Sequence, residues 1–334
     1  MNTTTIEYRD ARASALELAE RDVRLIIDEA RRLADDFAGS TLHDERLLRQ
    51  IEMAADGLGD AVRGRLIAFR DDGDDDGVLL VRGLPLDELP PTPSGTGTSP
   101  AWTELPVATV GQLMIMSQLG RSLSYIDEKC GQLVQDVCPQ PGAEQRQENS
   151  GSVLLELHTE DGFHPNMPHF LSLLGLRGDH DGVAVTVTAG VRATLGDLDQ
   201  DTIAQLGRPD FRIRYSSSFT GGDEAWFSSP MPVLGAAGEL RVDFHASEGV
   251  TPAATEALAR LESAMRDRLV GVVLEPGELL VVDNRAAVHG RTGFQPRYDG
   301  TDRWLRRSFA VTDLRPVRPR LVHGRAHEAI TVGR

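Results

Sequence analysis

The chain has few cysteines, few cationic residues and no long apolar run. Its 334 residues contain only Cys130 and Cys138, which is typical of a reduced intracellular protein, although the two thiols could pair. Arginine and lysine number 35 against 51 acidic residues, and the formal net charge is -16. Phosphate groups would repel such a chain, so we expect neither a nucleic-acid partner nor binding to an anionic membrane surface.

Targeting and membrane signals are also missing from the sequence. No stretch of about 18 consecutive apolar residues occurs, so no membrane-spanning helix is predicted. The segment Met1–Glu7 lacks the basic and apolar regions of a signal peptide. We therefore expect a cytoplasmic protein. Hydrophobic residues make up 40% of the chain, enough for a sizeable core in one large domain or two ordinary ones.

The first third of the chain reads mainly as helix. Apolar residues recur at helical spacing over residues 11–70, and charged residues fill the other face. Residues 71–77 form an acidic turn, and because the glutamate that closes an EF-hand loop is absent, we expect a solvated turn instead of a calcium site. Residues 78–81 read as a buried strand, and residues 107–120 as a helix.

From about residue 121, short apolar runs alternate with turns, which predicts many short strands. The expected strands are 153–157, 170–176, 183–188, 211–216, 278–282 and 304–311, with one long helix over 252–271. This pattern favours a mainly β protein with flanking helices and a jelly-roll core. We expect a single domain over residues 1–334. A mainly helical region, 1–77, would pack on a core of 78–315, and 316–334 would form a C-terminal tail.

Three residues can form a metal-binding set. His158 and Glu160 follow an apolar run, and residues two apart on a strand point to the same side. His289 lies far downstream, beyond the predicted strand 278–282, and can supply the third ligand. Two imidazoles and one carboxylate form the facial ligand set of non-haem Fe(II) oxygenases, which leaves open positions on the metal. Alternatively, each histidine is an isolated structural residue.

The other histidines have a weaker context for metal binding. His164 and His169 lie near the motif, but the proline-containing loop between them is less suited to ligation. Surface positions are expected for His43, His180, His323 and His327.

Two arginines on a predicted inward face support the prediction of a metal site. Arg303 and Arg307 fall on the same face of the predicted strand as Leu305, Phe309 and Val311. Buried cations need partners, and arginine binds carboxylates in bidentate fashion. Two such arginines near a metal would suit two small molecules that each carry a carboxylate. The alternative is that Arg303 pairs with an acidic residue of the protein itself.

Three stretches together resemble a known family. They are Leu157–Asp161, Asp283–Arg291 and Phe294–Leu305. They are similar to the clavaminate-synthase-like Fe(II)/2-oxoglutarate oxygenases, and most similar to bacterial hydroxylases of free amino acids such as arginine, asparagine and lysine. The resemblance covers roughly residues 78–315. It implies a double-stranded β-helix fold, Fe(II) bound by the His–Glu–His set, and 2-oxoglutarate and O₂ as co-substrates, with succinate and CO₂ formed.

The resemblance also implies roles for individual residues. Arg303, helped by Thr186, would bind the distal carboxylate of 2-oxoglutarate. Arg307 would bind the α-carboxylate of the amino acid, and Glu128 would hold its α-amine. Asp243 would hold the polar end of the substrate side chain.

One departure from the family pattern bears on the substrate. Arginine and lysine hydroxylases of the family tend to carry Asp-x-Asp where this chain has Asp243-Phe244-His245. Losing the second carboxylate weakens the case for a cationic side chain, although His245 could still tolerate one. The sequence therefore predicts hydroxylation of a free polar L-amino acid, with arginine first and lysine, asparagine or citrulline behind it. The alternatives are desaturation, a non-catalytic jelly-roll binding protein, or a redox-inert metalloenzyme. The sequence leaves a homodimer open.

Overall fold

The computed structural model describes residues 6–94, 100–147, 151–220 and 226–328. Three helices form the N-terminal region: α1 (Glu20–Asp36), α2 (Glu45–Ala55) and α3 (Asp60–Asp71). Before them, where helix was predicted, the chain forms β1 (Arg9–Asp10), a short 3-10 helix η1 (Ala11–Ser14) and β2 (Leu16–Glu17). These two strands pair in parallel with strands of the core, so tertiary pairing overrides the local helical spacing.

Two sheets form the jelly roll. The larger sheet runs in the order β15-β16-β4-β14-β7-β12-β3-β2, and β5 also pairs with β14. Its main strands are β3 (Val78–Arg82), β4 (Arg121–Tyr125), β5 (Val134–Val137), β7 (Phe170–Arg177), β12 (Leu279–Asp283) and β14 (Trp304–Val311). The smaller sheet runs β1-β11-β8-β13-β6. It contains β6 (Leu155–His158), β8 (Thr186–Gly190), β11 (Val270–Val272) and β13 (Ala287–Arg291).

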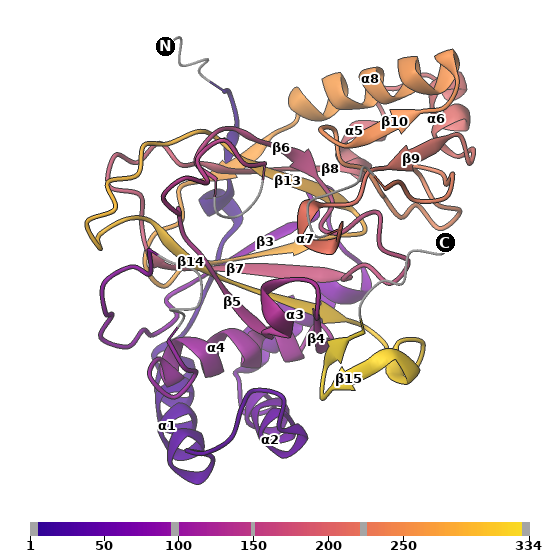
Figure 1. The fold of residues 1–334 in the computed structure, drawn as a ribbon. Coiled ribbons are helices and arrows are strands. Elements are labelled where there is room, and N and C mark those ends of the chain that lie inside the picture. The colour runs from indigo at the N-terminus through magenta and orange to yellow at the C-terminus, as the bar shows by residue number, and fades with distance from the viewer. Residues whose placement is uncertain (1–5, 95–99, 148–150, 221–225, 329–334) are drawn as a thin grey trace.

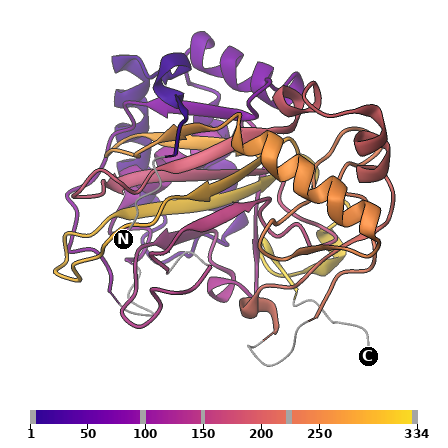
Figure 2. The ribbon, with the colours of Figure 1, turned by 90° about the horizontal axis from the view of Figure 1, so that it is seen from above.

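Helices cover both outer faces of this sandwich (Figures 1 and 2). On the side of the larger sheet, α4 (Pro106–Ser117) lies against β7 and β14, Phe69 of α3 contacts Phe170 of β7, and α1 and α2 pack on α4. On the smaller sheet lie α8 (Pro252–Arg266), α5 (Val191–Leu195) and α6 (Gln200–Leu206). Apolar side chains from both sheets fill the space between them, including Leu280 and Phe309 of the larger sheet and Val272 of the smaller one. The site described below lies in this middle layer. Among the described residues, no helix is long and apolar enough to cross a membrane.

Alternation along the smaller sheet sends polar residues inward. On β13, Val288 packs against the outer helices, whereas His289 and Arg291 face the cavities between the sheets. The neighbouring strand β6 breaks this alternation. His289 pairs with His158 but Arg291 pairs with Leu155, so β6 carries one extra residue, a β-bulge. Because of the bulge, Leu155 and His158 both line the same cavity between the sheets although they are three residues apart.

The remaining connections differ in part from the sequence predictions. The acidic segment 71–77 is a turn, as predicted, in which the Asp74 carboxylate accepts the backbone N–H groups of Gly77 and Val78. A small hairpin pairs β9 (Phe211–Ile213) with β10 (Ser247–Gly249). The predicted C-terminal tail instead contributes structure: β15 (Leu321–His323) and β16 (Ala326–His327) join the larger sheet beside β4. Residues 329–334 of that prediction lie outside the described residues.

Glu278 anchors the N-terminal segment to the core. Its carboxylate is only 5% exposed and accepts hydrogen bonds from Arg12 at 2.8 Å and from Arg82 at 3.1 Å. We predict that Glu278→Ala lowers the free energy of unfolding by about 3 kcal/mol, because both guanidinium groups lose a buried partner. Glu17→Ala is the control. Glu17 pairs with the same Arg82 but is 61% exposed, so its loss should cost less than about 1 kcal/mol. Equal losses in urea unfolding would contradict this role of Glu278.

Candidate active site

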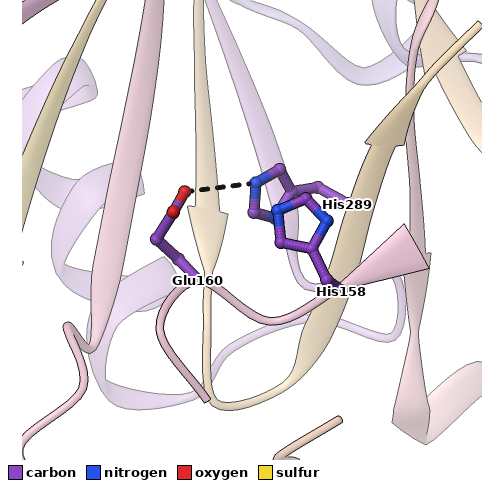
Figure 3. A group of neighbouring side chains, drawn as sticks. All are labelled: His158, Glu160 and His289. Carbon is purple, nitrogen blue, oxygen red and sulfur yellow. Dashed lines mark ion pairs between the residues drawn. The ribbon is translucent and has the colours of Figure 1, made fainter. Parts of the chain in front are cut away.

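His158, Glu160 and His289 meet in the middle layer (Figure 3). Their potential ligand atoms all lie within 4.8 Å of one another, and no other such group of three or more occurs among the described residues. Nε2 of His289 lies 3.4 Å from a carboxylate oxygen of Glu160. The two imidazole rings have centroids 4.3 Å apart. Two imidazoles and one carboxylate at this spacing fit an Fe(II) ion.

The surroundings of the two histidines prepare them for ligation. Nδ1 of His158 lies 2.8 Å from the carbonyl oxygen of Glu156. Donation to that carbonyl fixes the tautomer and leaves Nε2 for a metal. His289 is buried on β13, and burial, followed by the nearby His158, lowers its pKa to about 4. It is therefore neutral at physiological pH, which is the form that binds metals.

Glu160 reaches the site by a route that differs from the prediction. It does not share a strand with His158, because β6 ends at His158 and Glu160 lies in the turn that follows. Asn284 holds this turn in place. Its side-chain oxygen accepts the Glu160 N–H at 2.7 Å, and its side-chain nitrogen donates to the Glu160 carbonyl at 3.0 Å. Asn284, which the sequence analysis did not single out, is fully buried in the turn between β12 and β13.

Arg307 lies at the centre of a buried charge cluster. It forms an ion pair with Glu160 at 2.9 Å, another with Glu128, and a hydrogen bond to Gln135 at 3.2 Å. Burial by itself would raise the pKa of Glu160, but the charge of Arg307 and the adjacent histidines hold it below the usual range. Burial raises the pKa of Glu128.

Asp161 belongs to the same cluster and was missed by the sequence analysis. It is buried, its backbone has φ of 49°, and its pKa is raised well above the ordinary value by burial and by the nearby Glu128 and Glu160. One carboxylate oxygen of Asp161 and one of Glu128 have no hydrogen-bond partner within the described parts of the chain. The signal in the sequence was adjacency to the metal motif, which by itself does not reveal that the side chain faces a cavity.

A cavity of about 370 Å³ opens beside the metal ligands. Its wall includes Glu128, His158, Glu160, Asp161 and Asp243, so four of the predicted site residues meet there. Asp243 lies opposite His158 through an isolated antiparallel bridge. His245 does not join them, because its side chain is exposed and is not part of the wall.

A smaller space lies on the other side of the metal ligands. About 30 Å³ in volume, it is lined by residues that include Thr186, His289, Arg291, Arg303 and Arg307. Arg303 donates to the Thr186 hydroxyl at 3.3 Å. Burial and the neighbouring Arg291 lower the pKa of Arg303 to about 9, and burial lowers that of Arg291 to about 10. The predicted pair Arg303 and Thr186 is thus brought together, with Arg291 as an unpredicted neighbour.

Comparison with known proteins identifies the family. Residues 68–309 match the family described as "Taurine catabolism dioxygenase TauD, TfdA family". The chain belongs to this family. It is 42% identical to L-asparagine oxygenase of Streptomyces coelicolor over 89% of its own length and 90% of the relative. It is an Fe(II)/2-oxoglutarate-dependent dioxygenase with a jelly-roll fold, as the resemblance predicted.

Solved structures agree with this assignment. Asparagine oxygenase in complex with Fe(II), 2S,3S-3-hydroxyasparagine and succinate matches 95% of this chain and 100% of its own, with 40% identity and a TM-score of 0.88. The non-heme iron oxygenase OrfP in complex with Fe, succinate and (3S)-hydroxy-L-Arg matches 94% of this chain and 99% of its own, with 29% identity and a TM-score of 0.81.

Two further histidines near the site are buried without being ligands. His164 is fully buried, and its ring meets that of His327 edge-on at a centroid distance of 4.9 Å. The predicted surface position of His327 is therefore wrong, because β16 carries it into the core beside Tyr125. Burial, followed by the proximity of His327 and of Arg241 and Arg320, lowers the pKa of His164 to about 3.

The depressed pKa of His164 predicts a loss of stability in acid. Between pH 6.5 and about 3 the unfolded chain binds a proton at His164 that the folded protein does not. Stability from this group is present above pH 6.5 and falls with pH by up to about 1.4 kcal/mol per unit. We predict that, in metal-free protein, the free energy of unfolding of His164→Phe falls by about 2 kcal/mol less between pH 8 and pH 5 than that of the parent protein. Urea unfolding at both pH values measures this difference, and equal losses would contradict it.

Proposed function

We propose that the protein hydroxylates a free polar L-amino acid, with L-asparagine as the first candidate substrate and L-arginine as the second. The proposal places the enzyme in the cytoplasm, where free amino acids are available. The observation that carries it is the position of Asp243, which lies directly opposite the metal ligand His158 on the wall of the larger cavity. A substrate held by Asp243 would therefore have its side chain next to the metal.

Fe(II) and 2-oxoglutarate would complete the site. The His–Glu–His set would hold the iron, which together with 2-oxoglutarate supplies O₂ activation when bound. Arg303 and Thr186 would bind the distal carboxylate of 2-oxoglutarate. The protein's own contribution is to position both substrates and to keep their charges compensated.

The charge cluster around Arg307 suits the backbone of an amino acid. Arg307 would bind the α-carboxylate, since its planar guanidinium matches a carboxylate. Glu128 and Asp161 would accept the α-ammonium, because each has a buried oxygen without a hydrogen-bond partner among the described residues. A bound ammonium would also reduce the repulsion between these carboxylates and Glu160.

The side-chain end of the cavity supports an amide more than a cation. One oxygen of Asp243 already accepts the backbone N–H groups of His245 and Ala246, which leaves only the other oxygen for a ligand and disfavours the bidentate contact that a guanidinium makes. Lys129 and Arg146 also line the cavity, and their charges would oppose a guanidinium. The relative with the amide product, asparagine oxygenase, is also more similar to this chain than OrfP is. Arginine remains the second candidate because Asp243 could pair with a guanidinium.

A panel of free amino acids tests this proposal. Each would be incubated with the enzyme, Fe(II), 2-oxoglutarate and O₂, and the products examined by mass spectrometry for the gain of one oxygen. We expect kcat/KM for asparagine to exceed that for arginine by about tenfold or more, the scale that one misplaced polar group produces. His289→Ala should give no product. A higher value for arginine would reverse the order, and no hydroxylated amino acid would refute the proposal.

The role of Asp243 can be tested against that of its neighbour. We predict that Asp243→Ala lowers the preference for asparagine over other accepted amino acids by about tenfold, because it removes the group that contacts the side chain. His245→Ala is the matched control, two residues away but exposed and outside the cavity wall, and it should leave the ranking unchanged. If both variants keep the parent's ranking in competition assays, Asp243 does not determine the substrate.

A further inference from the structure

Arg291 stands next to the proposed 2-oxoglutarate site, yet neither the sequence motif nor the metal geometry gives it a role. It lies two residues after His289 on β13, so both side chains point to the same side of the sheet. Across the ladder Arg291 is paired with Thr186 on β8. Thr186 in turn accepts the hydrogen bond from Arg303. Arg291, Thr186 and Arg303 thus line the same small cavity.

Both arginines are buried without a carboxylate partner. Each is 4% exposed, and neither forms an ion pair with any residue of the described chain. Asp179 acts on Arg303 without forming an ion pair with it, and one of its oxygens accepts the N–H groups of Val183 and Ala184. By contrast, Arg306 and Arg307 on β14 are each paired with a buried carboxylate.

The contacts of Arg291 leave its charge uncompensated. It donates to the carbonyl oxygens of Thr292 and Val153, at 3.3 and 2.8 Å, and its guanidinium lies over the ring of Phe294 at 4.9 Å. These neutral partners orient the side chain but do not offset a full positive charge. Burying two adjacent cations is unfavourable unless an anion joins them. The small cavity is therefore prepared for a ligand that brings negative charge.

We propose that Arg291 is a second cationic binding residue for 2-oxoglutarate, acting on the distal carboxylate together with Arg303. The inference rests on the proposed role of Arg303 and deepens it. A carboxylate between two guanidinium groups would be held by charge from β13 and from Arg303, which immediately precedes β14. The site would then select 2-oxo acids that carry a second carboxylate over those that end in an alkyl group.

The test measures co-substrate binding directly. Binding of 2-oxoglutarate would be followed by calorimetry with Mn(II) in place of iron and without amino acid, so the result does not depend on which amino acid is the substrate. We expect Arg291→Gln to raise the Kd for 2-oxoglutarate by about tenfold, the scale of one charge-assisted contact. Arg291→Lys, which keeps the charge, should recover part of the loss. Arg285→Gln is the control, because this nearby arginine pairs with Asp283 and does not line the cavity.

A second ligand separates binding from a merely structural role. 2-Oxopentanoate has the same 2-oxo acid group but no distal carboxylate. If Arg291 binds that carboxylate, Arg291→Gln lowers the preference for 2-oxoglutarate over 2-oxopentanoate by about tenfold. If Arg291 only supports the fold, the variant weakens both ligands alike and lowers the melting temperature, and the inference is overturned.

Measuring Arg303→Gln in the same way separates a failure of the inference on Arg291 from a failure of the proposed role of Arg303. If Arg303→Gln weakens 2-oxoglutarate binding and Arg291→Gln does not, only the inference on Arg291 fails. If neither variant changes the Kd, the small cavity is not the co-substrate site, and the proposed role of Arg303 fails as well.

Discussion

The buried charge of Arg307 is the constraint on which the site depends. It pairs with Glu160 and Glu128 at once, and it holds Glu160 through the carboxylate oxygen that is not the one near His289. An ion pair at this depth gives little net stability by itself, but removing one partner leaves an uncompensated charge. The main effect of Arg307 is therefore positional. Its ion pairs fix β14, the turn after β6 and the segment after β4 relative to one another.

Two groups of buried charged residues near the metal ligands are unbalanced in opposite senses. Three acidic residues, Glu128, Glu160 and Asp161, act on the single guanidinium of Arg307. Arg291 and Arg303, by contrast, have no ion pair within the described chain. The first group thus has an excess of acidic groups and the second an excess of positive charge. A divalent cation and an α-ammonium would correct the first imbalance, and a dicarboxylate the second. The metal and the two substrates would therefore compensate the buried charges that the protein itself leaves unbalanced.

The sequence allowed most residues of this site to be predicted, but not the local structure that positions them. The inward positions of Leu305, Arg307 and Phe309 could be predicted because they follow a two-residue period along the long strand β14, whereas Arg303 lies just before this strand. The reasoning that placed Glu160 on a strand was wrong, because Asn284 holds it in a turn. The bulge in β6 was invisible, since nothing in its composition marks an extra residue. Burial of His327 depends on β16 pairing with the distant β4, a contact that no local pattern encodes.

The division of labour between sheets and loops explains why the reaction class is easier to assign than the substrate. The metal ligands and the buried arginines lie on paired strands, next to them, or in a turn that is hydrogen-bonded to them, so the fold itself holds their positions. Asp243 instead lies in the irregular segment that leads into β10, Arg146 lies in a loop, and Lys129 begins a short 3-10 helix, η2 (Lys129–Gly131). Loops tolerate exchange without disturbing the core. Structures that hold a hydroxyasparagine and a hydroxyarginine superpose on this chain with TM-scores of 0.88 and 0.81. The same fold thus holds different amino acids, and our proposal attributes the choice between them to a few residues around the larger cavity.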